Sequence, residues 1–257
     1  MRYNIGIDIG STCAKTIVMD EKKNIIHRLL QPTGWSSIDT AGTIREKLTE
    51  LGVDWDNAAV VATGYGRIAV PYADKCVTEI TCHGRGASHI FGSDDLTVID
   101  IGGQDTKLIC VEDSMVKDFV MNDKCSAGTG RFLEVMANTL GVAPGDLCVL
   151  ASQGGGVSIS SMCTVFAESE VISLIGRGEA KENIAFGVVD SIVKKVATQA
   201  GRLHLEGNKV CLTGGLCDFD YVRTSLSKCL NVDVETQPDG RYAGAIGAAL
   251  SAVNIKK

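Results

Sequence analysis

The sequence lacks both an excess of positive charge and a long hydrophobic run. Its 25 Lys and Arg residues face 31 Asp and Glu residues, giving a net charge of −6. This balance argues against a nucleic-acid partner, because phosphate backbones are bound by clustered basic residues. The longest apolar run near the C-terminus, residues 243–253, is too short and too rich in Gly and Ala to span a bilayer. The strand pattern begins by Tyr3, so we expect no signal peptide and a cytoplasmic protein.

The ten cysteines include no Cys-x-x-Cys pair, so their spacing alone reveals neither a zinc site nor an iron–sulfur site. In a cytosolic chain they are thiols, metal ligands or redox groups before they are disulfides. A lone cysteine is most often a small buried hydrophobic residue. We expect that role for eight of them: Cys13, Cys76, Cys82, Cys110, Cys148, Cys211, Cys217 and Cys229.

Two similar motifs open the two halves of the chain, at residues 5–12 and 98–107. Each has alternating β-branched residues, then an Asp, then glycines with small hydroxyl or amide residues, and a lysine follows, Lys15 or Lys107. Glycine lets backbone N–H groups approach an anion, hydroxyls donate hydrogen bonds, and Asp holds a hydrated metal. One copy is a weak signal. Two copies favour a duplicated fold that binds the phosphates of a nucleotide between its halves.

These motifs define a set of candidate site residues. Asp8, Asp100 and Asp105 are expected to line a magnesium site through water, because Mg²⁺ gives up its hydration shell reluctantly. The loop residues expected to contact phosphate are Gly10, Ser11, Thr12, Gly102, Gly103 and Gln104. Lys15 is a further phosphate candidate, although a strand lysine is usually solvated. For catalysis, Gln104 would orient the attacking water, and Asp105 is the rival as a base.

The periodicity predicts an α/β chain in which one order of elements occurs twice. In the first half we expect strands at 3–9, 13–20, 23–30 and 58–63, and helices at 36–51 and 79–91. The first helix should bury Ile38, Ala41, Ile44, Leu48 and Leu51. In the second half we expect strands at 96–101, 105–111, 115–121, 157–160, 210–213 and 231–236, and helices at 129–140, 166–177, 180–204, 218–229 and 240–253. Gly141 and Pro144 should end the helix at 129–140. The expected domains are residues 1–93 and 94–257, and the final helix is a candidate to pack back on the first domain.

The two loops resemble the phosphate-1 and phosphate-2 loops of the actin, sugar kinase and heat-shock-protein-70 ATPase superfamily. Residues 212–215, Leu-Thr-Gly-Gly, resemble the adenosine motif of the same superfamily. The resemblance implies a two-lobed actin-like ATPase fold built of duplicated ribonuclease-H-like βββαβαβα lobes. It also implies that ATP binds with its nucleoside against Gly214 and Gly215, which makes Cys217 a packing residue or a neighbour of the nucleoside.

Two cysteine-bearing segments narrow the resemblance. Residues 122–132, Asn-Asp-Lys-Cys-Ser-Ala-Gly-Thr-Gly-Arg-Phe, and residues 162–171 resemble signatures of the activators of 2-hydroxyacyl-CoA dehydratases and of the related benzoyl-CoA reductase ATPase subunits. Residues 242–249 resemble the C-terminal helix of that family. The resemblance implies that Cys125 and Cys163 bind one [4Fe–4S] cluster between two identical subunits, because two thiolates from each chain complete a set of four. Each cysteine precedes a predicted helix, whose N-terminus favours an anionic group.

The same resemblance implies a function. ATP hydrolysis would be coupled to low-potential one-electron transfer to an acceptor dehydratase or reductase, from a donor such as ferredoxin or flavodoxin, under anaerobic conditions. Two alternatives stay open. A small-metabolite kinase of this fold, of the sugar or pantothenate type, would need neither Cys125 nor Cys163. A nucleotide-gated binding protein would show slow ATP hydrolysis and no iron.

Overall fold

The computed structural model describes residues 2–160, 163–203, 205 and 209–255. It divides into two compact units that are discontinuous in sequence. Unit 1 comprises the chain up to Val98, the segment Ile109–Asp118, and the chain from Asp239 onward. Unit 2 comprises Ile99–Leu108 and Phe119–Pro238. The boundary that the sequence suggested near residue 93 falls inside unit 1.

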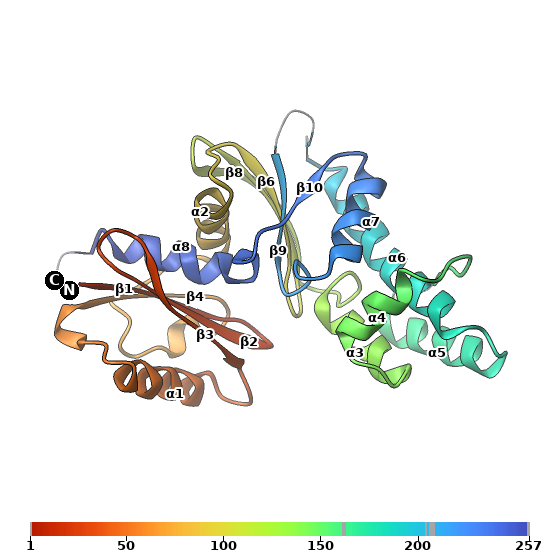
Figure 1. Cartoon of the computed structure of the whole chain (residues 1–257), viewed down its shortest axis with the longest axis horizontal. Coiled ribbons are helices and arrows are strands. Elements are labelled where there is room, and N and C mark those ends of the chain that lie inside the picture. The colour runs from red at the N-terminus through yellow and green to blue at the C-terminus, as the bar shows by residue number, and fades with distance from the viewer. Residues whose placement is uncertain (1, 161–162, 204, 206–208, 256–257) are drawn as a thin grey trace. The chain divides into compact units, whose positions relative to one another are not determined.

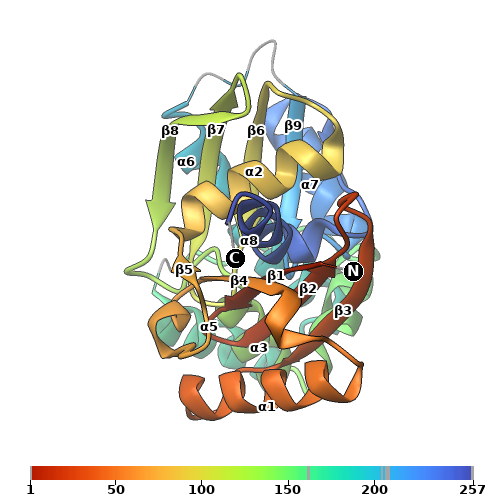
Figure 2. The ribbon, with the colours of Figure 1, turned by 90° about the vertical axis from the view of Figure 1, so that its left-hand side faces the viewer.

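Unit 1 is built on a five-stranded sheet with the order β3-β2-β1-β4-β5 (Figure 2). Its strands are β1 (Tyr3–Ile9), β2 (Cys13–Met19), β3 (Ile25–Pro32), β4 (Ala58–Thr63) and β5 (Lys75–Cys76). The first three strands pair antiparallel, and β4 pairs parallel with both β1 and β5. All of β4 and all of β1 beyond Tyr3 are buried, as expected for strands covered on both faces.

Helices cover the two faces of this sheet. Helix α1 (Ser37–Glu50) packs its buried residues against the isoleucines of β1 on one face. Helices α2 (Glu79–Phe91) and α8 (Ala243–Ala252) cover the other face. Three glycines allow α8 to approach β1 and α2 closely. A β-carbon at Gly6 of β1 would overlap the backbone of Ala245 in α8. A β-carbon at Gly86 of α2 would overlap the backbone of Ala243, and one at Gly247 of α8 would overlap that of Cys82. The C-terminal helix is therefore an integral layer of unit 1.

The second sheet repeats the topology of the first. It contains β6 (Leu96–Ile101), β7 (Thr106–Glu112), β8 (Met115–Asn122), β9 (Lys209–Gly214) and β10 (Val234–Glu235). Its order, β10-β9-β6-β7-β8, is the order of the first sheet when β6 to β10 are matched to β1 to β5. The duplication expected from the two loop motifs is confirmed.

The helices of unit 2 enclose its larger hydrophobic core (Figure 1). They are α3 (Gly130–Thr139), α4 (Pro144–Ala151), α5 (Thr164–Gly176), α6 (Lys181–Ala200) and α7 (Asp220–Leu230). Short 3₁₀ turns occur at Trp55–Asn57, Arg67–Ala69 and Gly240–Tyr242. No single described helix is long and apolar enough to cross a membrane, and α3 and α4 meet that test only as a pair bent by 84°.

Several local expectations were wrong. Pro144 opens α4, which the sequence analysis missed, because proline is tolerated where a helix begins and its missing N–H would be unpaired anyway. Residues 157–160 form no strand. Ile38 and Leu51 are 67% and 44% exposed, and Thr40 joins the buried face of α1 instead. Helix α6 ends at Ala200, while His204 of the predicted helix and residue 162 of the second cysteine segment lie outside the described residues.

Candidate functional site

The first loop, between β1 and β2, is held by a hydrogen bond within its own backbone, and the residues at its tip are accessible. The N–H of Gly10 donates to the carbonyl of Cys13 at 3.1 Å, and the hydroxyl of Thr33 donates to the carbonyl of Gly10 at 2.7 Å. Gly10, Ser11 and Thr12 are partly exposed. Lys15 is also partly exposed and lies opposite Asp8 in the β1–β2 register. The predicted phosphate residues of this loop are therefore accessible and close in sequence to the buried end of β1.

Asp8 lies at that end in a cradle lined by glycine. A β-carbon at Gly64, whose φ is +83°, would lie 2.5 Å from Oδ1 of Asp8, and one at Gly244 would lie 2.6 Å from Oδ2. The carboxylate is buried, and its Oδ1 has no hydrogen-bond partner in the described part of the chain. His83 Nε2 is 4.0 Å from Oδ2. A buried carboxylate oxygen without a partner is unfavourable, so this donor suits a bound, hydrated cation.

The second loop, between β6 and β7, repeats the geometry of the first. The N–H of Gly102 donates to the carbonyl of Asp105 at 2.9 Å, as the N–H of Gly10 does to Cys13 three residues ahead. Gln104 is exposed at the tip, and Gly103 is partly exposed. Asp105 is only 4% exposed, and its side chain folds back over Gly102 so closely that a β-carbon there would overlap Oδ1 of Asp105. Only glycine fits at position 102 without moving this carboxylate.

A buried lysine joins the two aspartates of the second motif. The Nζ of Lys107, a side chain 1% exposed, is 2.8 Å from Oδ1 of Asp105 and 3.5 Å from Oδ2 of Asp100. Thr213 donates its hydroxyl to Oδ1 of Asp100 at 2.8 Å. The remaining oxygen, Oδ2 of Asp105, is buried and has no hydrogen-bond partner among the residues that the structure describes. The sequence analysis missed this network, in which Asp100 has both oxygens engaged and Asp105 keeps one.

The strand that precedes the predicted adenosine loop ends in a tight turn against β6. Gly214 has a φ of +86°, and a β-carbon there would lie 3.0 Å from Oδ1 of Asp100. The N–H of Gly215 donates to the carbonyl of Ile101 at 3.1 Å. Gly64, after β4, has the same φ sign and the same close approach to the aspartate of its own motif. The shared Thr-Gly after a buried strand is the sequence signal that marks the two turns as equivalent.

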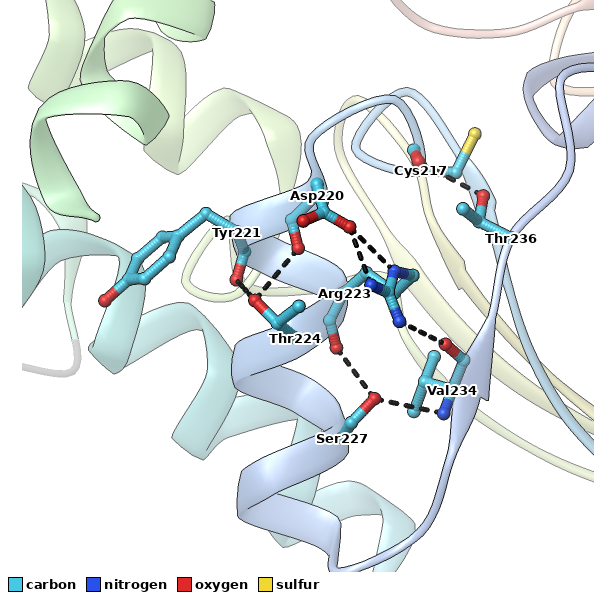
Figure 3. A network of polar contacts seen from close by, with 8 residues as sticks. All are labelled: Cys217, Asp220, Tyr221, Arg223, Thr224, Ser227, Val234 and Thr236. Carbon is cyan, nitrogen blue, oxygen red and sulfur yellow. Dashed lines mark hydrogen bonds and ion pairs between the residues drawn. The ribbon is translucent and has the colours of Figure 1, made fainter.

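A polar network supports the loop after β9 (Figure 3). The hydroxyl of Thr236 donates to the carbonyl of buried Cys217 at 3.1 Å. Arg223 of α7 donates to Asp220 at 2.7 and 2.9 Å and to the carbonyl of Val234 in β10 at 3.4 Å. Helix α7, β10 and this loop are thus tied together, and the predicted packing role of Cys217 agrees with its burial.

Cys125 and Cys163 belong to neighbouring segments of unit 2. Cys163 is exposed and is the N-cap residue of α5. Cys125 is partly buried in the loop after β8, four residues before the N-cap of α3, so only Cys163 directly precedes a helix. The hydroxyls of Ser126 and Thr164, the residues that follow the two cysteines, are hydrogen bonded at 2.6 Å. Asn122 donates to the carbonyl of Cys125 at 2.8 Å.

Cys125 and Cys163 are more accessible than the buried cysteines of the chain. No group of three or more His, Cys, Asp or Glu side chains within residues 2–160, 163–203, 205 and 209–255 is arranged to hold a metal ion. All ten cysteines are free. The burial expected for eight of them is found for four, whereas Cys76 and Cys229 are exposed and Cys13 and Cys110 are partly exposed. Burial raises the pKa of three other thiols to about 12, which disfavours the thiolate form that binds metal; these are Cys82, Cys148 and Cys211. Cys125 and Cys163 lie outside this buried group.

One backbone and one side-chain hydrogen bond connect the second loop to the segment that carries Cys125. The N–H of Gly130 donates to the carbonyl of Gly102 at 2.9 Å. The buried hydroxyl of Thr106 donates to the carbonyl of Gly128 at 2.6 Å. A displacement of the loop at Gly102 therefore acts directly on the turn between Cys125 and α3.

Comparison with known proteins gives consistent results. The model of the BadF/BadG/BcrA/BcrD ATPase family matches residues 5–252. The (R)-2-hydroxyglutaryl-CoA dehydratase activating ATPase of Acidaminococcus fermentans is 44% identical over 253 residues, which is 97% of this chain and 96% of that protein. The activator of lactoyl-CoA dehydratase of Anaerotignum propionicum is 39% identical and covers 97% of both chains.

Solved structures agree with the sequence relatives. Component A of the Acidaminococcus fermentans dehydratase has a TM-score of 0.92 at 43% identity and covers 98% of both chains. The activator of 2-hydroxyisocaproyl-CoA dehydratase from Clostridium difficile, solved with bound ADPNP, has a TM-score of 0.91 at 35% identity, covering 98% of this chain and 94% of that one. A ROK family glucokinase from Streptomyces griseus, at 17% identity, TM-score 0.60 and coverage of 97% and 98%, shares the fold alone, which is the actin-like ATPase fold.

Proposed function

The chain belongs to the BadF/BadG/BcrA/BcrD ATPase family, and from this membership we propose that it is an ATP-driven reductive activator. It acts as a homodimer that hydrolyses ATP and delivers single electrons at low potential to an acceptor enzyme of the 2-hydroxyacyl-CoA dehydratase or benzoyl-CoA reductase type. The observation that carries the proposal is the hydrogen bond between Ser126 and Thr164, which brings the Cys125 and Cys163 segments together. A kinase of this fold would need neither Cys125 nor Cys163.

ATP is the nucleotide, and Mg²⁺ accompanies it. The partly exposed glycines of both loops offer backbone N–H groups to phosphate. Asp8 and Asp105 each keep one buried oxygen without a hydrogen-bond partner in the described residues, which suits a cation that binds oxygen and retains waters. Gln104, the exposed residue of its loop, orients the attacking water. The ADPNP bound to the Clostridium difficile relative supports the assignment.

A [4Fe–4S] cluster is held by Cys125 and Cys163 of two chains. The exposure of Cys163 at the start of α5 allows a second chain to contribute the other pair, and the helix N-terminus favours negative charge there. When bound, the cluster supplies one-electron chemistry. The hydrogen bonds from Gly130 to Gly102 and from Thr106 to Gly128 provide a route by which nucleotide state alters the cysteine segment.

The proposal also includes an electron donor, a cellular setting and an acceptor. Ferredoxin or flavodoxin is the electron donor, and the setting is an anaerobic cytoplasm. Both curated relatives described above are named for dehydratases, which makes a dehydratase the favoured acceptor. An acceptor of the reductase type is the alternative.

The experiment is anaerobic purification followed by iron, sulfide and ATPase measurements. The wild type should hold about four iron atoms per dimer, and Cys125→Ala and Cys163→Ala should each abolish iron binding. Cys229→Ala, an exposed cysteine on α7, is the matched control and should retain iron. Iron retained in both Cys125→Ala and Cys163→Ala would refute the cluster assignment. ATP consumption that requires a sugar or pantothenate, without iron, would establish the kinase instead.

A further inference from the structure

Lys107 is a buried cation whose position next to the phosphate-2 loop calls for a role. Its side chain is 1% exposed, so it cannot reach a nucleotide or solvent directly. Its Nζ contacts Oδ1 of Asp105 at 2.8 Å and lies 3.5 Å from Oδ2 of Asp100. A lysine is rarely buried unless it is paired. The ammonium and the two carboxylates form a cluster with a net charge of −1.

We infer that Lys107 is a positioning residue that fixes Asp105 for metal binding, an inference that rests on the proposed ATPase function. By engaging Oδ1, the ammonium sets the rotation of the carboxylate and leaves Oδ2 as the oxygen available to a magnesium-bound water. Gly102 leaves room for this orientation, because a β-carbon at position 102 would overlap Oδ1 of Asp105. Asp100, bound by both Thr213 and Lys107, acts as the support of this arrangement.

The duplicated first loop provides an internal comparison. Residues 8, 10, 13 and 15 correspond to 100, 102, 105 and 107, each 92 positions later, and both loops have the same Gly-to-carbonyl hydrogen bond. In the first loop Cys13 occupies the position of Asp105, so no carboxylate faces the lysine from that position. Lys15 is correspondingly partly exposed, whereas Lys107 is buried. The two equivalent lysines therefore have different roles, phosphate contact for Lys15 and positioning of Asp105 for Lys107.

The test compares variants of Lys107 by ATP hydrolysis as a function of Mg²⁺ concentration. Lys107→Met should lower kcat by about 100-fold, the effect of a misplaced group near the reacting atoms, and should raise the Mg²⁺ concentration at half-maximal rate. Lys107→Arg, which keeps the charge, should recover part of the activity. Because Lys107→Met removes the ammonium from two buried carboxylates and can fail to fold, Lys107→Met/Asp100→Asn is measured beside it, since it preserves the net charge of the cluster.

A double-mutant cycle with Asp105→Asn separates positioning from a merely structural role. If Lys107 acts through Asp105, Lys107→Met should cost much less activity in the Asp105→Asn background than in the wild type. Lys194→Met, at the exposed pair with Asp190 on α6, controls for loss of a lysine and should leave the Mg²⁺ dependence unchanged. Unchanged kcat and Mg²⁺ dependence in the folded Lys107→Met/Asp100→Asn variant would overturn the inference.

The outcomes also distinguish this inference from the proposed function. A wild type that hydrolyses ATP but binds no iron would refute the cluster, while the effects of the Lys107 variants would still support positioning. A wild type that binds iron and hydrolyses ATP, with Lys107 variants of wild-type kinetics, would refute positioning alone. Additive effects of Lys107→Met and Asp105→Asn would likewise overturn it, because independent sites do not share a mechanism.

Discussion

Replacement of Gly102 by alanine tests the geometry of the phosphate-2 loop at a single atom. A β-carbon at this position would overlap Oδ1 of Asp105 and lie 3.2 Å from the carbonyl oxygen of the same residue. The φ of Gly102 lies outside the left-handed region, so alanine introduces no backbone strain and the effect is steric. Restoring an ordinary contact distance requires the carboxylate to move by roughly 1 Å. That movement breaks its contact with Lys107 and misdirects Oδ2.

The expected consequence is of similar size for activity and for stability, so the two quantities are measured separately. A misplacement of about 1 Å near the reacting groups lowers kcat by about 100-fold, equivalent to about 2.7 kcal/mol. Overpacking at one position costs about 1–3 kcal/mol of unfolding free energy. Steady-state ATPase assays over a Mg²⁺ series and urea unfolding measure the two quantities.

The matched control is Gly155→Ala in the same unit, where a β-carbon meets no atom within 4 Å. It should leave both quantities unchanged. Wild-type kcat and Mg²⁺ dependence in folded Gly102→Ala would refute the placement of Asp105 over the loop, and with it the reasoning that assigns Asp105 to the metal.

Three further predictions test other parts of the molecule. Gly6→Ala should lower the free energy of unfolding by about 3 kcal/mol, because its β-carbon overlaps the backbone of α8, and thermal unfolding measures this. Burial raises the pKa of Cys82, Cys148 and Cys211 to about 12 from an ordinary 9.0. Above that ordinary value the unfolded chain releases these protons and the folded chain keeps them, so stability falls as pH rises between about 9 and 12, and the Cys82→Ala variant should show a shallower fall in urea unfolding. Finally, a chelator should strip iron at a different rate with ATP than with ADP or without nucleotide, and equal rates with confirmed binding would exclude coupling through exposure of the cluster.

Sequence alone predicted the duplicated architecture because the signals were local and occurred twice. Asp8 and Asp100 each lie near the end of a strand of alternating β-branched residues, and a glycine follows each of them by two positions. Helix α4 was missed for the opposite reason. A proline can mark the end of one helix or the start of another; α3 already ends at Thr139, and Pro144 starts α4, whose Leu147 and Ala151 pack into the core of unit 2.

The network at the second loop could not be predicted from the sequence. A lysine in a strand is usually solvated, and nothing local distinguishes Lys107 from Lys15. The difference arises from contacts within the folded unit, where Asp105 and Asp100 converge on the ammonium and Thr213 reaches Asp100 from a strand more than a hundred residues later. The pairing of the Ser126 and Thr164 hydroxyls, 38 positions apart, is equally invisible in spacing.

Comparison of the two duplicated loops places the proposed redox function with the second loop. Both loops retain the aspartate, the closing hydrogen bond and the lysine, which are the parts that nucleotide binding requires. Among the residues that the structure describes, the second loop is hydrogen bonded to the segment that carries Cys125, through Gly102 to Gly130 and through Thr106 to Gly128. The first loop continues through β2 and β3 into α1 without an equivalent insertion. A change at the second loop therefore reaches both Asp105 and the turn that follows Cys125, which is the route by which we propose that nucleotide state alters the cysteine segment.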